Sequence, residues 1–176
     1  MKRFFIIGAA VASLFSIPAA LAHVTLANGQ ATVGGYYMAV VRVPHGCQGS
    51  DTTRLRVRIP EGVLAVKPQP KAGWAIDIVQ GKYDQPQTLH GAKLDQGVRE
   101  ISWSGALPDA YYDEFVFRAF LASSLKPGST LYFPVVQECA QGVDRWINTS
   151  GGEDAKDAAP RIKLIAPASG GAGHHH

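Results

Sequence analysis

The residue with the most distinctive chemistry is His23, because it is expected to become the first residue of the mature chain. Residues 1–22 begin with Lys2 and Arg3, continue as an apolar run and end in Ala-Leu-Ala, the pattern of a cleavable secretory signal peptide. Cleavage after Ala22 would leave His23 with a free α-amine beside its imidazole Nδ1. These two nitrogens can close a six-membered chelate ring, and nitrogen ligands in one plane suit Cu(II). His23 is therefore a candidate metal ligand that exists only after export.

Any further ligands would have to come from the folded domain. Asp113 and Glu114 precede an apolar segment, residues 115–121, so either carboxylate could bind a metal ion or end a strand in solvent. On a strand these neighbours would point to opposite faces. Trp146 could lie over an ion in a cation–π contact, or it could pack in the core. The residue types alone leave both pairs of alternatives open.

Cys47 and Cys139 are the only cysteines of the chain. An even number of cysteines in an exported protein favours a disulfide, which here would close a loop of about 90 residues. The alternative is a thiolate ligand in a copper site with His45, but a disulfide accounts for both cysteines at once. His45 is expected to be structural and His90 to lie in an exposed loop.

The elements that position these residues are expected to be short β-strands. Segments rich in β-branched and aromatic residues, several of them alternating in hydrophobicity, are separated by Gly and Pro at intervals of roughly 8–12 residues. The expected strands cover residues 36–43, 55–59, 63–66, 74–79, 98–104, 111–121, 130–136 and 161–165. The pattern predicts an all-β sandwich of about nine strands, a single domain over residues 23–167.

Composition narrows the classes of partner. The chain has 176 residues, of which 46% are hydrophobic and 18% charged, with a formal net charge of +3. This charge is too small and too scattered for a nucleic-acid-binding surface. No segment after the signal peptide is apolar for 18 residues, so no membrane span is expected after processing.

Residues 168–176 form a Gly/Ser/His tail that is expected to be flexible. Its last residues, His174, His175 and His176, could bind metal weakly or be part of a tag.

Several consecutive motifs together resemble the YcnI-like copper-binding proteins, over about residues 23–147. The motifs are Ala22-His23-Val24-Thr25-Leu26, Arg42-Val43-Pro44-His45-Gly46-Cys47, Thr52-Thr53 before Leu55 to Pro60, Val66 to Trp74, Tyr112-Asp113-Glu114-Phe115, and Phe133 to Gln137 with Cys139. The resemblance implies a cupredoxin- or immunoglobulin-like β-sandwich. It also implies one Cu(II) per chain, bound by the amine and imidazole of His23, with carboxylate oxygen from Glu114 and with Trp146 close to the ion.

The function implied by the resemblance is that of an exported, non-catalytic copper chaperone or buffer in copper homeostasis. Such a protein would be periplasmic or otherwise extracytoplasmic and would pass copper to other periplasmic or membrane copper-handling proteins. One alternative is a copper-dependent oxidative enzyme of the N-terminal-histidine type, for which only His45 or His90 could supply a second imidazole. The other is a metal-free scaffold, in which His23 has no role.

Overall fold

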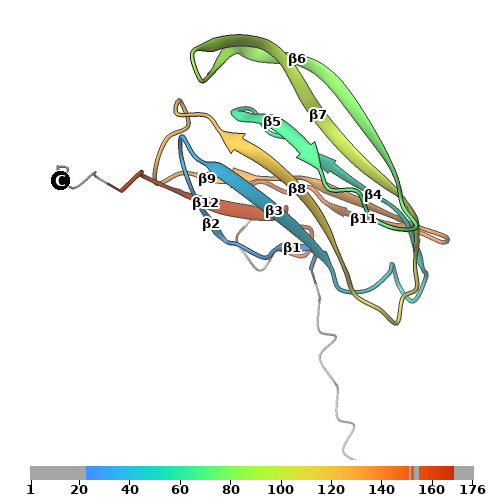
Figure 1. The fold of residues 1–176 in the computed structure, drawn as a ribbon. Helices are drawn as coiled ribbons and strands as arrows, with labels where there is room; N and C mark the ends of the chain where they lie inside the picture. The colour runs from blue at the N-terminus through green and yellow to red at the C-terminus, as the bar shows by residue number, and fades with distance from the viewer. Residues whose placement is uncertain (1–22, 151, 153–154, 169–176) are drawn as a thin grey trace, which may run out of the picture.

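The computed structural model describes residues 23–150, 152 and 155–168, and in them the chain forms twelve β-strands and no helix (Figure 1). The predicted signal peptide and His174, His175 and His176 lie outside the described residues. The strands are β1 (Thr25–Leu26), β2 (Gln30–Thr32), β3 (Tyr36–Val43), β4 (Thr52–Arg58), β5 (Val63–Pro68), β6 (Ala75–Leu89), β7 (Ala92–Leu107), β8 (Asp113–Leu121), β9 (Thr130–Tyr132), β10 (Val135–Cys139), β11 (Val143–Trp146) and β12 (Arg161–Ile165).

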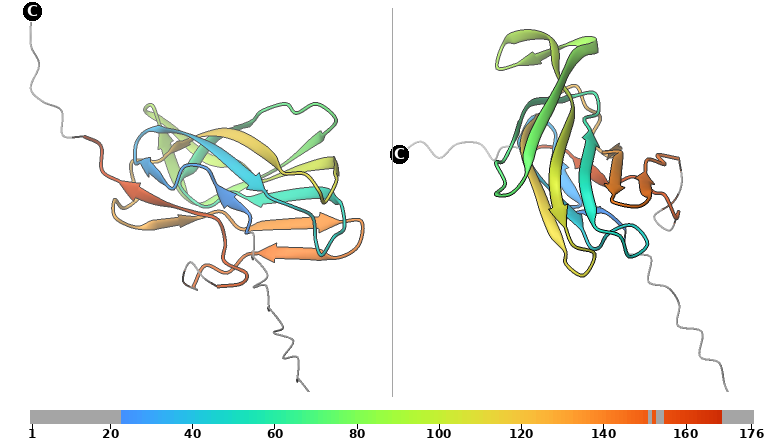
Figure 2. Two further views of the ribbon diagram at one scale, coloured as in Figure 1. Left: turned by 90° about the horizontal axis from the view of Figure 1, so that it is seen from below. Right: turned by 90° about the vertical axis from the view of Figure 1, so that its right-hand side faces the viewer.

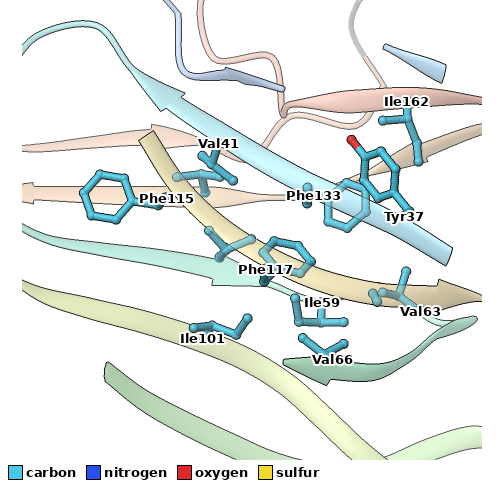
Figure 3. Packing of buried hydrophobic residues seen from close by; sticks show 14 of the residues in the cluster. Tyr37, Val41, Ile59, Val63, Val66, Ile101, Phe115, Phe117, Phe133 and Ile162 are labelled. Atoms are coloured by element: carbon cyan, nitrogen blue, oxygen red, sulfur yellow. The ribbon is translucent and has the colours of Figure 1, made fainter. Parts of the chain in front are cut away.

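The strands form three sheets around one main core. The four-stranded sheet has the order β1-β3-β8-β5, the five-stranded sheet β11-β10-β4-β7-β6, and the three-stranded sheet β2-β12-β9. Trp103 of β7 and Phe115 of β8 pack edge to face across the core, with ring centroids 5.6 Å apart. Figure 3 shows Ile101, Phe117 and Phe133 gathered in the same core. This arrangement confirms the predicted single-domain β-sandwich.

The strand count is higher than the nine or so expected from the sequence. The expected strand 130–136 is divided into β9 and β10, because Pro134 has no N–H for a sheet ladder and lies where the chain passes from one sheet to another. β1, β2 and β11 are each four residues or shorter, too short to show a periodic pattern.

The largest difference from the expected strands is the length of β6 and β7. Their hairpin extends beyond the rest of the sandwich (Figures 1 and 2) and turns at His90 and Gly91, both of which have positive φ. Although β6 and β7 belong to the five-stranded sheet, the turn reaches strands of the four-stranded sheet. The Tyr36 hydroxyl lies 3.2 Å from His90 Nε2, and the His90 ring centroid lies 5.3 Å from that of Phe120. The hairpin therefore covers a second apolar cluster that includes Leu64.

Tyr37 gives the core a pH-dependent contribution to stability. Its side chain is only 5% exposed, its hydroxyl donates a hydrogen bond to the Asn28 carbonyl at 3.0 Å, and burial raises its pKa to about 12. The folded state keeps this proton after the unfolded state has lost it near pH 10. The stabilisation is therefore complete below pH 10 and is lost as the pH rises towards 12.

We expect the Tyr37→Phe protein to lose less of its free energy of unfolding than wild type between pH 10 and pH 12. The difference should be about 2 to 3 kcal/mol, since the pKa shift is about two units and each unit corresponds to about 1.4 kcal/mol. At pH 7 the variant should be about 1 kcal/mol less stable because it lacks the hydrogen bond. Urea unfolding at several pH values measures both effects, with Tyr111→Phe as the control at an exposed tyrosine. Parallel pH profiles for wild type and Tyr37→Phe would refute the prediction.

Candidate metal centre

The structure brings His23 and Trp146 together. His23 lies two residues before β1 and is half-buried, and Trp146 is the last residue of β11. Their ring centroids are 5.0 Å apart, with an angle of 46° between the ring planes. Because β1 is an edge strand of the four-stranded sheet and β11 an edge strand of the five-stranded sheet, this contact joins two sheet edges.

Trp146 is held in place by its strand register. It pairs with Val135 of β10, whose side chain is fully buried, so Trp146 also faces the interior and is only 7% exposed. The indole N–H can only donate a hydrogen bond. Among the described residues Nε1 has no hydrogen-bond partner, although the atom is buried. The side chain of Trp146 is therefore fixed by packing, next to the ring of His23.

A surface hollow lies beside His23. It is lined by residues 23–26 at the beginning of the described chain and by residues 158–161, which lead into β12. The half-buried His23 side chain therefore borders open space as well as the Trp146 ring. A small ion can reach this position from solvent.

Glu114 lies on the same sheet as β1, two strands away, and is paired with Arg42. Thr25 of β1 pairs with Arg42 of β3, and Arg42 pairs with Glu114 of β8, so the three residues form a row across three strands. Two strand spacings amount to about 10 Å. Arg42 Nε donates a hydrogen bond to Glu114 Oε1 at 3.0 Å. Arg42 thus lies between the strand that follows His23 and the Glu114 carboxylate.

The other candidate ligands have protein partners elsewhere. Asp113 accepts a hydrogen bond from Lys71 Nζ at 2.7 Å, His45 Nδ1 contacts the Gly46 carbonyl, and His90 lies at the β6–β7 turn. Within the described parts of the chain, no three His, Cys, Asp or Glu side chains lie close enough together to bind a metal ion. A site at His23 would therefore depend on its α-amine as a second donor.

Cys47 and Cys139 form the predicted disulfide, with Cα atoms 5.9 Å apart. This bond excludes the alternative thiolate ligand. A disulfide is typical of proteins that fold in an oxidising compartment. No helix suited to crossing a membrane is found in the residues that the structure describes.

Arg42 was not predicted from the sequence to take part in the site. It is the only charged residue in the apolar segment Tyr36–Val43, and this isolated position was the available signal. The contribution of residues 158–161 had no such signal, because the preceding segment is polar and built of small residues. Both features depend on pairing between distant segments.

Comparison with solved structures supports the fold. An uncharacterized protein from Nocardia farcinica, described as having an immunoglobulin-like fold, is 22% identical and has a TM-score of 0.58; the match covers 81% of this chain and 98% of the other. A type I cohesin from Pseudobacteroides cellulosolvens is 10% identical, with a TM-score of 0.38, over 87% of this chain and 96% of the cohesin. The second likeness is too distant to support a conclusion.

No curated protein matches the chain. Residues 23–164 match the family described as "Domain of unknown function (DUF1775)". The match begins at His23, covers β1 to β11 and reaches Leu164 in β12. The chain therefore belongs to the DUF1775 family and has an immunoglobulin-like β-sandwich fold.

Proposed function

We propose that the processed protein is an exported copper-binding protein that holds one Cu(II) at His23. Its role would be that of a chaperone or buffer in copper homeostasis, in the periplasm or another extracytoplasmic compartment. The observation that carries the proposal is the contact between His23 and the buried ring of Trp146 at an accessible sheet edge. The contact places the imidazole of the expected N-terminal residue beside a fixed aromatic ring.

The donor set at this position fits Cu(II). The α-amine and Nδ1 of His23 provide two nitrogen ligands, which suit the tetragonal geometry of Cu(II) and its high place in the divalent affinity order. The amine has an ordinary pKa near 8, so a metal ion can displace its proton at neutral pH. Glu114 would supply a carboxylate oxygen after leaving Arg42. Trp146 would restrict the approach of water on one side.

The accessible position of His23 favours capture and transfer over catalysis. Its ligands would come largely from one residue, which leaves the remaining positions around the ion open to a receiving protein. A catalytic site of the N-terminal-histidine type needs a second imidazole. His90 is hydrogen-bonded to Tyr36 at the β6–β7 turn, and His45 contacts the backbone at Gly46. We therefore propose transfer to another copper-handling protein.

Titration of the processed protein with Cu(II) tests the proposal, with intact mass confirming that the chain begins at His23. We expect one tightly bound Cu(II) per chain and a tetragonal, nitrogen-rich EPR spectrum. Cu(II) quenches nearby indole fluorescence, so most of the quenching should come from Trp146, 5.0 Å from the His23 ring.

We expect Trp146→Phe to retain one Cu(II) but to lose most of the Cu(II)-induced quenching. The matched control is Trp74→Phe, because the ring of Trp74 packs against Phe115, whereas that of Trp146 packs against His23. Trp74→Phe should keep the quenching. Equal quenching in the two variants would place the ion away from Trp146. Weak binding at several positions would contradict the proposed function.

A further inference from the structure

Arg42 and Glu114 form an ion pair within the row of paired residues that crosses β1, β3 and β8. The proposed site at His23 lies just before β1. We propose that Arg42 is a positioning residue that holds the Glu114 carboxylate away from His23 and competes with the bound ion for it. Copper affinity is then lowered slightly by this exchange of partners. The inference rests on the proposed function, since it concerns the release of copper from the same site.

The strand register favours the exchange. Arg42 pairs in register with Thr25 on one side and with Glu114 on the other, and its Nε lies 3.0 Å from Glu114 Oε1. His23 precedes Thr25 by two residues, beyond the paired part of β1. The strand that carries Arg42 therefore lies between the Glu114 carboxylate on β8 and the strand that follows His23. The carboxylate cannot give both of its oxygens to the ion while Oε1 accepts the hydrogen bond from Arg42.

The exposure of the pair makes the exchange easy to reverse. The side chains of Arg42 and Glu114 are 50% and 33% exposed, so water screens their attraction. An ion pair of this kind changes an equilibrium by a factor of up to about five. Such a pair weakens copper binding slightly without preventing it. It also gives the carboxylate a partner to return to when the ion leaves, so that Glu114 is not left unpaired.

Measurement of Cu(II) affinity in a double-mutant cycle tests the inference. We expect Arg42→Gln to bind Cu(II) about three- to fivefold more tightly than wild type at low ionic strength, and less so at high salt. In the Glu114→Gln background the same Arg42→Gln substitution should have no effect. The cycle separates competition for the carboxylate from simple repulsion between Arg42 and the ion, because repulsion would persist without the carboxylate.

Lys71→Gln is the matched control. It removes one positive charge from a neighbouring ion pair, since Lys71 Nζ lies 2.7 Å from Asp113 Oδ1. It should leave the affinity unchanged. As a readout that needs no copper, the Arg42 Nε–Hε NMR signal of the metal-free protein should shift in Glu114→Gln and stay in place in Lys71→Gln.

Two results would overturn the inference while leaving the proposed function intact. One is equal Cu(II) affinity in wild type and Arg42→Gln, and the other is tighter binding that persists in the Glu114→Gln background. Both presuppose that wild type binds Cu(II) through the α-amine of His23. If blocking this amine does not weaken binding, the proposed function fails, and the inference fails with it.

Discussion

Acetylation of the α-amine of His23 is expected to weaken Cu(II) binding by roughly 100-fold or more. The modification leaves the imidazole and the packing against Trp146 in place but removes one arm of the chelate. Two linked ligands commonly bind 100-fold more tightly than either alone, because the second acts at a high effective concentration. The α-amine has a lower pKa than a lysine side chain, so mild acylation near neutral pH modifies it selectively.

The experiment compares Cu(II) dissociation constants and EPR spectra of acetylated and unmodified protein. His23→Ala is the companion variant, which keeps an α-amine but lacks the imidazole and should lose affinity to a similar extent. Thermal unfolding of the metal-free proteins is the control, and both changes should leave it nearly unaltered because His23 is half-buried and precedes β1. Unchanged affinity after acetylation would eliminate the proposed chelate.

Removal of the disulfide is expected to cause the largest loss of stability. The double variant Cys47→Ala with Cys139→Ala should have a free energy of unfolding about 4 kcal/mol lower than that of wild type. The bond joins positions 92 residues apart, and a cross-link over such a distance strongly restricts the unfolded chain. Urea unfolding of the variant and of the reduced wild-type protein measures the effect.

The alanine double variant and the reduced wild-type protein should have the same free energy of unfolding. This agreement is the control that the loss comes from the missing disulfide and not from altered packing around alanine. The Cu(II) EPR spectrum of the folded variant should remain that of wild type, since both cysteines bond to each other and neither is a proposed ligand. A loss below about 1 kcal/mol, or an altered spectrum, would contradict this division between the bond that stabilises the fold and the site that binds copper.

The sheet architecture could be predicted from the sequence because its main strands show clear patterns. The expected strand 36–43 has the same bounds as β3, because apolar residues line its buried face and Pro44 follows it. The strands that the sequence did not reveal are short or polar. The β6–β7 extension is mostly exposed, so it carries no apolar alternation that would distinguish a strand from a loop.

The candidate site was only partly predictable, for a different physical reason. His23 is singled out by local sequence, because the expected cleavage position lies directly before it. Its contact with Trp146 depends on the meeting of two sheet edges that are about 120 residues apart in the chain. The partner of Glu114 depends in the same way on the register between β3 and β8. Register is set by the packing of whole strands, which a single sequence specifies only indirectly.

The long β6–β7 hairpin has a consequence for behaviour at high protein concentration. β5 is an edge strand of the four-stranded sheet, and exposed edges of this kind invite aggregation by strand pairing between molecules. The hairpin packs over the buried Leu64 of β5, and its outer strand β6 is an edge of the five-stranded sheet. β6 contains Lys82 and Pro86 and has two irregularities in its register, all of which hinder the docking of another strand. The hairpin thus packs against one edge strand, β5, and has an outer strand, β6, that resists self-association.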